Sequence, residues 1–356
     1  MEPTPGTRHP RLDEAIQALI AEAIDLNGSR RDTDLLEEML TTVVQLNADA
    51  ADRGDLKLIN TSLREMRNAF LLFGKYRAER KVSVFGSARL PEDDPNYRMA
   101  VSFAEEMAQR RDWMVVTGAG PGIMEAANRG AGPGRSFGVN IRLPFEDAAN
   151  PFVEPDRLID FHYFFTRKLI FVKESDAFAL FPGGFGTLDE TFELLTLTQT
   201  GKTSVHPIVL LEAPGTGYWQ PWLDFVETSL VRKGTISAHD LNLFTYTTDP
   251  MAAADEITRF YTNYHSQRFV GDRLVLRLVR PLGDEDLAWL NDEFGDMLAS
   301  GRIEAIEATE TEIADDDHVE LPRLRLHFDR RSLGRLRYMV DAINDLSPGE
   351  PAPAGD

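Results

Sequence analysis

The spacing of apolar residues changes twice along the chain and divides it into three stretches. Residues 11–79 carry apolar side chains three and four positions apart, which predicts three helices. Residues 80–264 alternate short, mostly apolar segments with amphipathic ones. Residues 265–346 begin with the apolar–polar alternation of a half-buried strand. We therefore expect a helical N-terminal region, a central domain and a C-terminal appendage, between tails at 1–10 and 347–356 whose Pro- and Gly-rich composition predicts disorder.

The central stretch predicts a parallel β-sheet with helices on both faces. Its short apolar segments end at glycine-rich turns, and segments with helical spacing lie between them. This alternation is typical of an α/β fold with Rossmann-like topology, in which ligands bind beyond the carboxyl ends of the strands. The expected strands are residues 81–85, 113–117, 137–141, 158–163, 177–181 and 207–211, and the expected helices are residues 97–111, 123–131, 167–175, 188–200, 219–231 and 252–264.

The C-terminal stretch predicts a small α+β appendage with the order β-α-β-β-α. The expected elements are a strand at 273–279, a helix at 284–298, strands at 303–308 and 323–328, and a helix at 330–344. The acidic segment Asp315–Asp317 lacks the alternating oxygen ligands and the glycine of a calcium loop, so we expect a solvated loop there. The densest basic stretch of the chain either lies on solvated faces or binds an anionic effector such as a regulatory nucleotide; it comprises Arg323, Arg325, Arg330, Arg331, Arg335 and Arg337.

Composition excludes several classes of function. The 356 residues contain no cysteine, which rules out disulfides, thiolate catalysis and cysteine zinc sites. A net charge of −20 argues against nucleic acid or an anionic membrane as a partner. The sequence has no run of about 18 apolar residues that would cross a membrane. The N-terminus also lacks an apolar signal segment, so we expect a cytoplasmic protein.

The segment Phe181–Glu190, with the sequence FPGGFGTLDE, is the most specific candidate for chemistry. A buried strand, a glycine-rich turn and a helix follow one another there, so backbone N–H groups at the helix N-terminus can hold a phosphate. The carboxylates Asp189 and Glu190 follow directly, and the cations Arg167 and Lys168 lie shortly upstream. An anion cradle with cations and carboxylates favours chemistry on a phosphorylated sugar over plain dinucleotide binding.

Each of these features also has a purely structural interpretation. Thr187 and Glu190 have the spacing of a capping box, in which both side chains serve the helix N-terminus. The aliphatic stems of Arg167 and Lys168 could simply cover the core. The turn Gly118–Gly122 fits neither the dinucleotide spacing nor a P-loop, so it is either a tight strand-to-helix turn or a ligand contact.

The Pro-Gly-Gly-x-Gly-Thr-x-x-Glu turn, with its upstream Arg-Lys pair, resembles the Lonely Guy (LOG) family, many of whose members were formerly labelled lysine decarboxylases. The resemblance covers residues 80–264 and includes Gly86-Ser87, Thr117–Ala126 and Leu143–Glu146, while Ala119 stands where the family usually has glycine. It implies hydrolysis of nucleoside 5′-monophosphates, including cytokinin riboside monophosphates, to free base and ribose 5-phosphate. The N- and C-terminal regions resemble those of longer bacterial members described as AMP nucleosidases, which favours ordinary purine nucleotides.

The resemblance and the residue chemistry agree on the roles within the site. The backbone of Gly183–Thr187 would hold the 5′-phosphate, and Glu190 would stabilise the oxocarbenium-like sugar or position the attacking water. Arg167 would place the ribose phosphate or stabilise the departing base, and Glu146 would hold ribose or base. No metal or other cofactor is expected. The remaining expected substrate contacts are Gly86, Ser87, Gly118, Gly120, Met124, Glu125, Lys168, Gly183, Gly184, Phe185, Gly186, Thr187 and Asp189.

Two other functions stay open at this point. A non-enzymatic nucleotide sensor or carrier would use the same fold without hydrolysis, since a fold alone does not imply catalysis. Decarboxylation would need a lysine that forms an imine with pyridoxal phosphate, and nothing marks Lys168 or Lys173 for that role. The resemblance also implies a homodimer or higher homo-oligomer, for which the N-terminal helices offer packing surface.

Overall fold

The chain divides into two compact units, Met1–Arg67 and Asn68–Asp356. The computed structural model describes residues 6–7, 9–27, 32–142 and 149–346. The first unit is helical and contains α1 (Pro10–Asn27), α2 (Thr33–Ala48) and the first part of α3 (Arg53–Phe73), as the helical spacing of the N-terminal stretch predicts.

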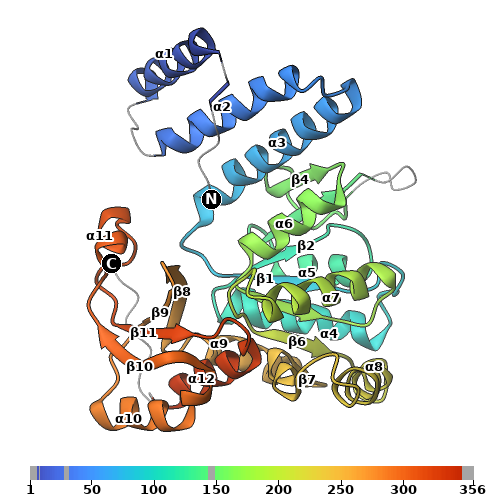
Figure 1. The fold of residues 1–356 in the computed structure, drawn as a ribbon. Coiled ribbons are helices and arrows are strands. Elements are labelled where there is room, and N and C mark those ends of the chain that lie inside the picture. Colours follow the sequence, from blue (N-terminus) through green and yellow to red (C-terminus); the bar gives the residue numbers. More distant parts are fainter. Residues whose placement is uncertain (1–5, 8, 28–31, 143–148, 347–356) are drawn as a thin grey trace. The chain divides into compact units, whose positions relative to one another are not determined.

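A seven-stranded sheet forms the centre of the second unit, with the strand order β4-β3-β2-β1-β5-β6-β7 (Figure 1). All neighbouring strands are parallel, and Val82 of β1 pairs with Val115 of β2 on one side and Ala177 of β5 on the other. The strand order reverses between β1 and β5, which makes their carboxyl ends the topological switch point where ligands bind in such sheets. The strands are β1 (Lys81–Phe85), β2 (Met114–Thr117), β3 (Ser136–Ile141), β4 (Leu158–Phe161), β5 (Ala177–Leu180), β6 (Ile208–Leu211) and β7 (Thr245–Thr247).

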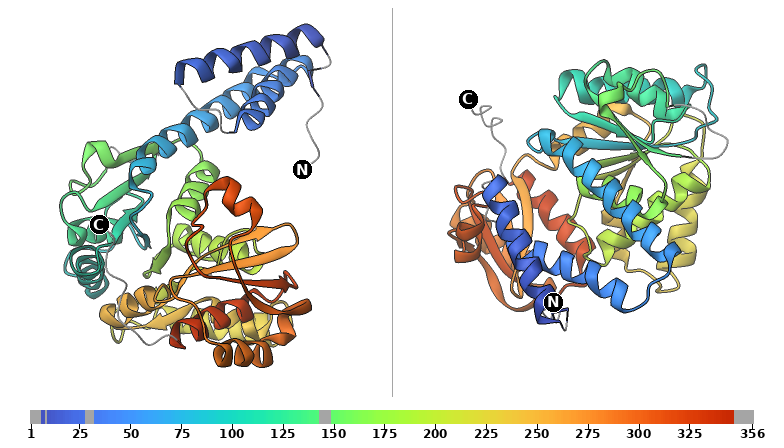
Figure 2. Two further views of the ribbon diagram at one scale, coloured as in Figure 1. Left: turned by 90° about the vertical axis from the view of Figure 1, so that its left-hand side faces the viewer. Right: turned by 90° about the horizontal axis from the view of Figure 1, so that it is seen from above.

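Helices cover both faces of this sheet, and two separate apolar cores result (Figure 2). On one face, Phe103, Ala126 and Ile257 pack against inward-facing strand residues such as Val84. The expected Rossmann-like α/β fold is therefore confirmed. The helices of the first core are α4 (Pro95–Glu105), α5 (Ile123–Ala131) and α9 (Pro250–Arg259), and those of the second core are α6 (Phe164–Glu174), α7 (Phe185–Gln199) and α8 (Trp219–Phe225).

The C-terminal part of the second unit contains a four-stranded antiparallel sheet with the order β10-β11-β9-β8. One face packs against α10 and α12 in a third apolar core, to which Leu276, Leu290 and Leu336 belong. The opposite face carries Arg277 and Arg323, which are register partners on β9 and β11. The elements are β8 (Tyr264–Val270), β9 (Arg273–Leu278), α10 (Asp284–Glu293), β10 (Leu298–Ile306), α11 (Glu310–Asp315), β11 (Arg323–Phe328) and α12 (Leu333–Asp345).

Several predicted elements are wrong in position. The helix expected at 252–264 ends at Arg259, and β8 follows it, so the appendage has one more strand than expected. Only Tyr264 of β8 is buried, because β8 is an edge strand, and its sequence therefore lacks a strand pattern. A short helix that was not expected, α11, begins with a capping box at Thr309 and ends at Asp315, while Asp316 and Asp317 follow it outside any helix or strand, in keeping with the expected loop. Finally, α6 begins at Phe164 rather than Arg167.

Candidate active site

Three turns meet at the switch point of the seven-stranded sheet. The turn after β1 and the turn after β5 are joined by the Ser87 N–H, which donates to the Pro182 carbonyl at 2.9 Å. The turn after β2 joins them through the Ile123 N–H, which donates to the Ser87 carbonyl at 3.0 Å. Gly86 is required by this contact, because a Cβ there would lie 2.6 Å from Ile123. The three glycine turns predicted at strand ends thus form one structure.

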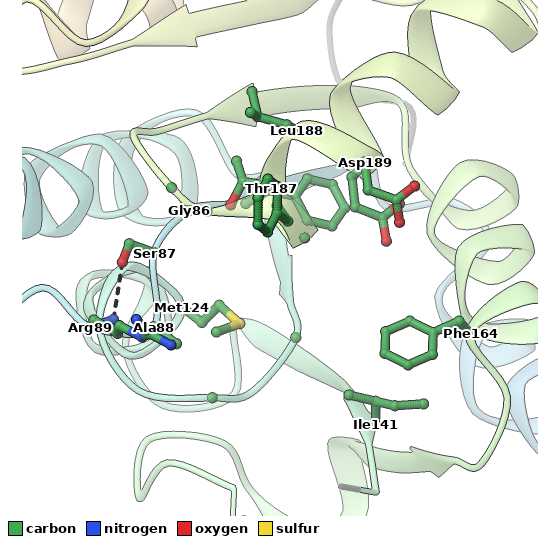
Figure 3. A pocket seen from close by; sticks show the side chains of 18 of the residues that line it. Gly86, Ser87, Ala88, Arg89, Met124, Ile141, Phe164, Thr187, Leu188 and Asp189 are labelled. Carbon is green, nitrogen blue, oxygen red and sulfur yellow. Dashed lines mark hydrogen bonds between the residues drawn. The ribbon is translucent and has the colours of Figure 1, made fainter.

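A cavity of about 790 Å³ opens at these turns (Figure 3). In Figure 3, Phe164 and Ile141 lie on the side of Asp189, and Ser87 and Arg89 lie on the opposite side. The structure brings thirteen of the expected site residues to this cavity: Gly86, Ser87, Gly118, Gly120, Met124, Arg167, Gly183, Gly184, Phe185, Gly186, Thr187, Asp189 and Glu190. Its other lining residues are Phe85, Ala88, Arg89, Ile141, Phe164 and Leu188.

The N-terminus of α7 faces the cavity without a capping side chain. Helix α7 begins at Phe185, and its N-cap residue is Gly184. The first helical hydrogen bond runs from the Leu188 N–H to the Gly184 carbonyl at 3.1 Å, so the N–H groups of the preceding residues face outward from the helix end. Thr187 and Glu190 both lie inside the helix, and the capping-box interpretation is therefore wrong.

The glycines of this turn are not all explained by protein packing. A Cβ at Gly183 would lie 2.0 Å from Thr187 Oγ1, so packing requires glycine there. At Gly184 and Gly186, a Cβ would meet no described atom within 4 Å. Neither has a positive φ angle, and Gly184 has a φ of −92°. Neither packing nor backbone strain thus explains these two glycines, which leave the helix N-terminus accessible from the cavity.

Tyr218 supports the turn between β5 and α7 through a hydrogen bond. Its hydroxyl donates to the Gly183 carbonyl at 2.7 Å. The Tyr218 N–H in turn donates to Glu212, whose carboxylate also accepts from the Tyr246 hydroxyl at 2.9 Å. Sequence reasoning missed this support, because the contact joins residues 35 positions apart.

Glu190 is the buried carboxylate of the cavity, with 6% of the residue exposed. No hydrogen bond from any described residue reaches its oxygens, and Lys168 Nζ lies 3.9 Å from Oε2. Burial raises the pKa of Glu190 to about 7, although the charges of Lys168 and Arg167 act in the opposite direction. This carboxylate can therefore gain or lose a proton near neutral pH, as a general base must.

Lys168 lies behind the carboxylates and does not line the cavity. Its ammonium is 2.7 Å from Asp189 Oδ2 and also pairs with Glu193. Burial disfavours the charge, but hydrogen bonds to Asp189 and Glu193 raise the pKa of Lys168. Lys168 thus stays charged and holds the acidic face of α7 in place.

Arg167 lies at the cavity, beside the turn after β2. Its Nε donates to the Val139 carbonyl at 2.8 Å, and its guanidinium carbon lies 5.2 Å from the centre of the Phe171 ring. The guanidinium comes so close to the turn that a Cβ at Gly118 would lie 2.4 Å from Nη2. A side chain at Gly118 would therefore displace the Arg167 guanidinium.

The turn after β2 has alanine at position 119, and hydrogen bonds show how it tolerates this residue in place of glycine. Its φ is 60°, a left-handed conformation that costs an alanine roughly 1 kcal/mol. The Ala119 N–H donates to Thr117 Oγ1 at 2.9 Å, and its carbonyl accepts from the Asn150 N–H at 2.8 Å. Asn150 Nδ2 also donates to the Gly120 carbonyl and to Asn128 Oδ1. This buried hydrogen-bond network holds the strained turn in place.

Three expected site residues are missing from the cavity lining. Two of them lie elsewhere, and the third lies outside the described residues. Glu125 faces away and accepts from the Tyr97 hydroxyl at 3.2 Å. Lys168 lies behind it, as stated above. Glu146 lies outside the described residues. The residues that sequence reasoning missed are mostly apolar side chains at strand and helix ends, such as Phe85, Ile141 and Phe164, whose pattern does not differ from that of the core.

The basic stretch of the appendage is used mainly for internal contacts. Arg323 pairs with Glu312 at 3.2 Å, and Arg325 with Glu304 at 2.9 Å. The remaining contacts are Arg335 with Glu293 and Asp296, Arg337 with Glu256 and Asp341, and Arg330 with the Gly271 carbonyl and the Phe269 ring. Five of the six arginines therefore have partners within the protein.

Metal and membrane features are absent from the part of the chain that the structure describes. No group of three or more His, Cys, Asp or Glu side chains there could hold a metal ion. In the same ranges, no helix has both the length and the apolar character needed to cross a bilayer.

Solved structures of other proteins match about half of this chain at low similarity. The molybdenum cofactor binding protein from Rippkaea orientalis is 20% identical, with a TM-score of 0.36 over 51% of this chain and 96% of that one. The molybdenum cofactor carrier protein from Chlamydomonas reinhardtii is 23% identical, with a TM-score of 0.35 over 51% of this chain and 98% of that one.

Sequence comparison gives a family and named relatives. Residues 124–257 match the family described as "Possible lysine decarboxylase". The cytokinin riboside 5′-monophosphate phosphoribohydrolase LOG3 of Arabidopsis thaliana is 29% identical over 164 residues, which are 44% of this chain and 72% of that protein. The probable phosphoribohydrolase LOGL5 of Oryza sativa subsp. japonica is 32% identical over 44% of this chain and 63% of its own length. These matches confirm the resemblance seen in the sequence: the central segment of the chain is similar to proteins of the LOG family.

Proposed function

We propose that this protein hydrolyses the N-glycosidic bond of nucleoside 5′-monophosphates to give the free base and ribose 5-phosphate. The observation that carries the proposal is Glu190, a buried carboxylate with a pKa of about 7, one turn into a helix whose glycine-lined N-terminus opens on the same cavity. The names of the matched relatives support it, since they are phosphoribohydrolases.

The 5′-phosphate would bind at the N-terminus of α7. The backbone N–H groups of Phe185–Thr187 point outward there, and the helix dipole favours an anion. Gly184 and Gly186 leave room for the phosphate oxygens, and the Thr187 side chain borders the same space. A phosphate in this place would put the attached ribose beside the next turn of the helix, where Glu190 lies.

Glu190 would act on the sugar carbon. As the bond between C1′ and the base nitrogen breaks, positive charge develops on the ribose ring, and an ionised Glu190 stabilises that charge. A water molecule then forms the new C1′–O bond and gives one proton to the carboxylate. The base leaves with the electron pair of the broken bond and takes up a proton, so one water is consumed for each nucleotide.

A purine base would occupy the apolar side of the cavity. Ile141 and Phe164 line this side, Met124 also lines the cavity, and Arg167 lies beside Gly118. The guanidinium can stabilise negative charge on the departing base while its Nε stays bonded to Val139. We propose AMP or a related purine nucleotide as substrate. Glu146, which lies outside the described residues, stays a predicted contact with ribose or base.

A hydrolysis screen tests this function. Purified protein is incubated with AMP, GMP, CMP, UMP, IMP and a prenylated AMP, and free base and ribose 5-phosphate are separated by chromatography. Release of base from a monophosphate but not from adenosine is the expected result, because the phosphate is needed to place the ribose. Tight nucleotide binding without release of any base would instead show a sensor or carrier.

We further propose that the protein is a homo-oligomer. Phe165 and Leu169 of α6 are 53% and 50% exposed, and Phe185 of α7 is 94% exposed. Large exposed apolar side chains are typical of surfaces that another protein copy covers. Light scattering should give at least twice the mass of one chain, and a monomer at micromolar concentration would contradict this proposal.

A further inference from the structure

A second cavity lies at the opposite edge of the seven-stranded sheet from the candidate active site. Its volume is about 620 Å³. Lys81 lines it at the first residue of β1, Asp176 directly precedes β5, and His206 precedes β6. The cavity therefore opens at the amino ends of these strands, whereas the candidate active site lies at their carboxyl ends.

Cations dominate the charge of this second cavity. Four cationic residues line it, namely Arg77, Lys81, Lys173 and Lys202. The two acidic residues of the lining, Glu174 and Asp176, are already paired: Glu174 with Lys173 at 2.5 Å, and Asp176 with Arg80 at 3.2 Å. Among the described residues, no carboxylate forms an ion pair with Arg77, Lys81 or Lys202. In a chain with a net charge of −20, this is an unusual concentration of uncompensated positive charge.

Among these three residues, Lys81 is the strongest indication of an anion site, because it is buried, with 4% of the residue exposed. Its ammonium donates to the Glu79 carbonyl at 2.8 Å, which uses one of its three N–H groups. Burial lowers the pKa of Lys81, and nearby carboxylates such as Asp176 only partly oppose this. A buried ammonium without an ionic partner is unfavourable, and an anion in the cavity would relieve that cost.

Stabilisation of helix C-termini, the ordinary role of such cations, explains some of the four cationic residues but not all of them. Lys173 and Lys202 lie at or just beyond the C-terminal ends of α6 and α7, where positive charge stabilises a helix dipole. Arg77 is the C-cap residue of the 3₁₀ turn that directly continues α3, so a helix end accounts for it as well, whereas Lys81 begins a strand and serves no helix end. The segment that contains Arg77 and Lys81 and the distant segment that contains Lys202 thus bring three cations without an ionic partner among the described residues to one hollow.

We propose that this second cavity binds a diphosphate or triphosphate group, a ligand class distinct from the monophosphate of the candidate active site. Arg77, Lys81 and Lys202 would each contact phosphate oxygens, because three separate cations suit an anion with several charges. The volume falls within the usual range for small-molecule sites. Leu169 and Val172 form an apolar wall beside the cations, which would accept an organic portion of the ligand.

Isothermal titration calorimetry tests this proposal with tripolyphosphate as the probe. The titrations use full-length protein carrying Gly184→Asp, since a carboxylate at the N-cap of α7 repels anions from the candidate active site and leaves the second cavity unchanged. Arg77→Ala combined with Lys202→Ala should weaken binding at least about tenfold, because two charge-assisted contacts are lost. The matched control is Arg232→Ala with Lys233→Ala, which removes the same charge from an exposed segment outside the cavity.

The control pair should change the affinity by less than about twofold, as expected for charges outside the site. Equal weakening in both pairs would show non-specific attraction and overturn the proposal, as would the absence of binding at millimolar tripolyphosphate. Lys81→Met gives a further test with an apolar side chain of similar length, and it should abolish binding without lowering the melting temperature. ADP titrated in the same background separates the two ligand sources, because tighter binding than pyrophosphate indicates an organic diphosphate.

Discussion

Two of the buried glutamates of this protein, Glu190 and Glu312, lie in opposite surroundings. Glu312 of the appendage is fully buried, and its oxygens accept hydrogen bonds from Arg277, Arg323 and Thr309. Glu190 in the candidate active site is nearly as buried, but no described residue donates a hydrogen bond to it. Burial acts to raise the pKa of both, yet the hydrogen bonds lower that of Glu312 to about 2, while that of Glu190 rises to about 7.

This difference shows that the donors around a buried carboxylate, rather than burial itself, decide its protonation. A glutamate surrounded by donors stays ionised and acts as an anchor, as Glu312 does between β9, β11 and the segment around α11. A glutamate left without donors is unfavourable for folding, but it is free to exchange protons or to meet positive charge on a ligand. The first arrangement contributes to stability, and the second is suited to catalysis.

The largest expected effect is on turnover. Replacement of Glu190 by Gln keeps the shape of the side chain but removes the charge that would stabilise the sugar cation. We expect kcat for AMP hydrolysis to fall by about 10³-fold or more, on the scale of losing a key electrostatic group. Single-turnover release of adenine, followed by chromatography, measures this effect.

The matched control for that experiment is Glu312→Gln. This change leaves the candidate active site untouched, so kcat should stay within about twofold of the unaltered protein at a temperature where both are folded. Equal turnover in Glu190→Gln and the unaltered protein would exclude the catalytic role of Glu190. A loss of nucleotide binding in Glu190→Gln would show that this residue is needed for binding as well.

The next effect is on stability and concerns the appendage. Glu312→Ala leaves Arg277 and Arg323 buried without their shared carboxylate, and their side chains are 4% and 0% exposed. Breaking a buried ionic group in this way costs about 3–5 kcal/mol. Denaturant unfolding at pH 7 should show this loss. A change below about 1 kcal/mol would mean that water replaces the carboxylate and that Glu312 is not an anchor.

The pH dependence of stability should distinguish the two glutamates. Because the pKa of Glu190 is raised from 4.5 to about 7, its protonated form stabilises the fold fully below pH 4.5, and this contribution is lost as the pH rises through 7. Glu190→Gln should therefore gain stability over the unaltered protein above pH 7, by at most about 3 kcal/mol at about 1.4 kcal/mol per pKa unit. Urea unfolding at pH 5 and pH 8 measures the difference.

Glu312 should give the opposite result in the same titration. Its pKa is lowered from 4.5 to about 2, so its stabilising contribution is present above pH 4.5 and disappears as the pH falls through 2. The stability deficit of Glu312→Gln should thus be the same at pH 5 and pH 8. If the gain of Glu190→Gln were also constant between these two values, the raised pKa of Glu190 would be wrong.

The sequence predicts the central sheet well but the appendage only in part. Short, uniformly apolar segments such as Ala177–Leu180 are typical of buried strands, and the glycine turns mark the carboxyl ends of these strands. In contrast, β8 is defined by its ladder with β9, and its residues are largely polar because one edge of it lies open. Pairing with a distant strand leaves no trace in local spacing, so the extra strand could not be predicted from the pattern alone.

The candidate site shows a similar division. Glycines, hydroxyls and carboxylates of the Phe181–Glu190 segment are unusual enough in combination to be recognised. The apolar lining, such as Phe164, is not, since apolar residues at element ends usually belong to the core. The partners of charged residues are also hidden: Arg323 meets Glu312 only because the chain folds back, so a basic stretch in the sequence does not reveal whether its charges are free.

A smaller effect is expected from a variant that alters the surroundings of Glu190 rather than Glu190 itself. Lys168→Met removes the ammonium that lies 3.9 Å from Glu190 Oε2 without changing the lining of the cavity. Burial is the main cause of the raised pKa, and Lys168 is the charge that opposes it most. Its loss should raise the pKa of Glu190 further, so the acidic limb of the kcat/KM profile, expected near pH 7, should move to higher pH by up to about one unit.

Glu193→Gln provides the matched change of opposite sign. Glu193 is a neighbouring negative charge that raises the pKa of Glu190, and it does not line the cavity. Its neutralisation should move the acidic limb to lower pH, although Lys168 would lose one of its carboxylate partners. Opposite shifts in the two variants would show that the limb belongs to Glu190 and that nearby charges tune it, as hydrogen-bond donors tune Glu312. Shifts in the same direction would mean that the limb reports a different group, such as the phosphate of the substrate.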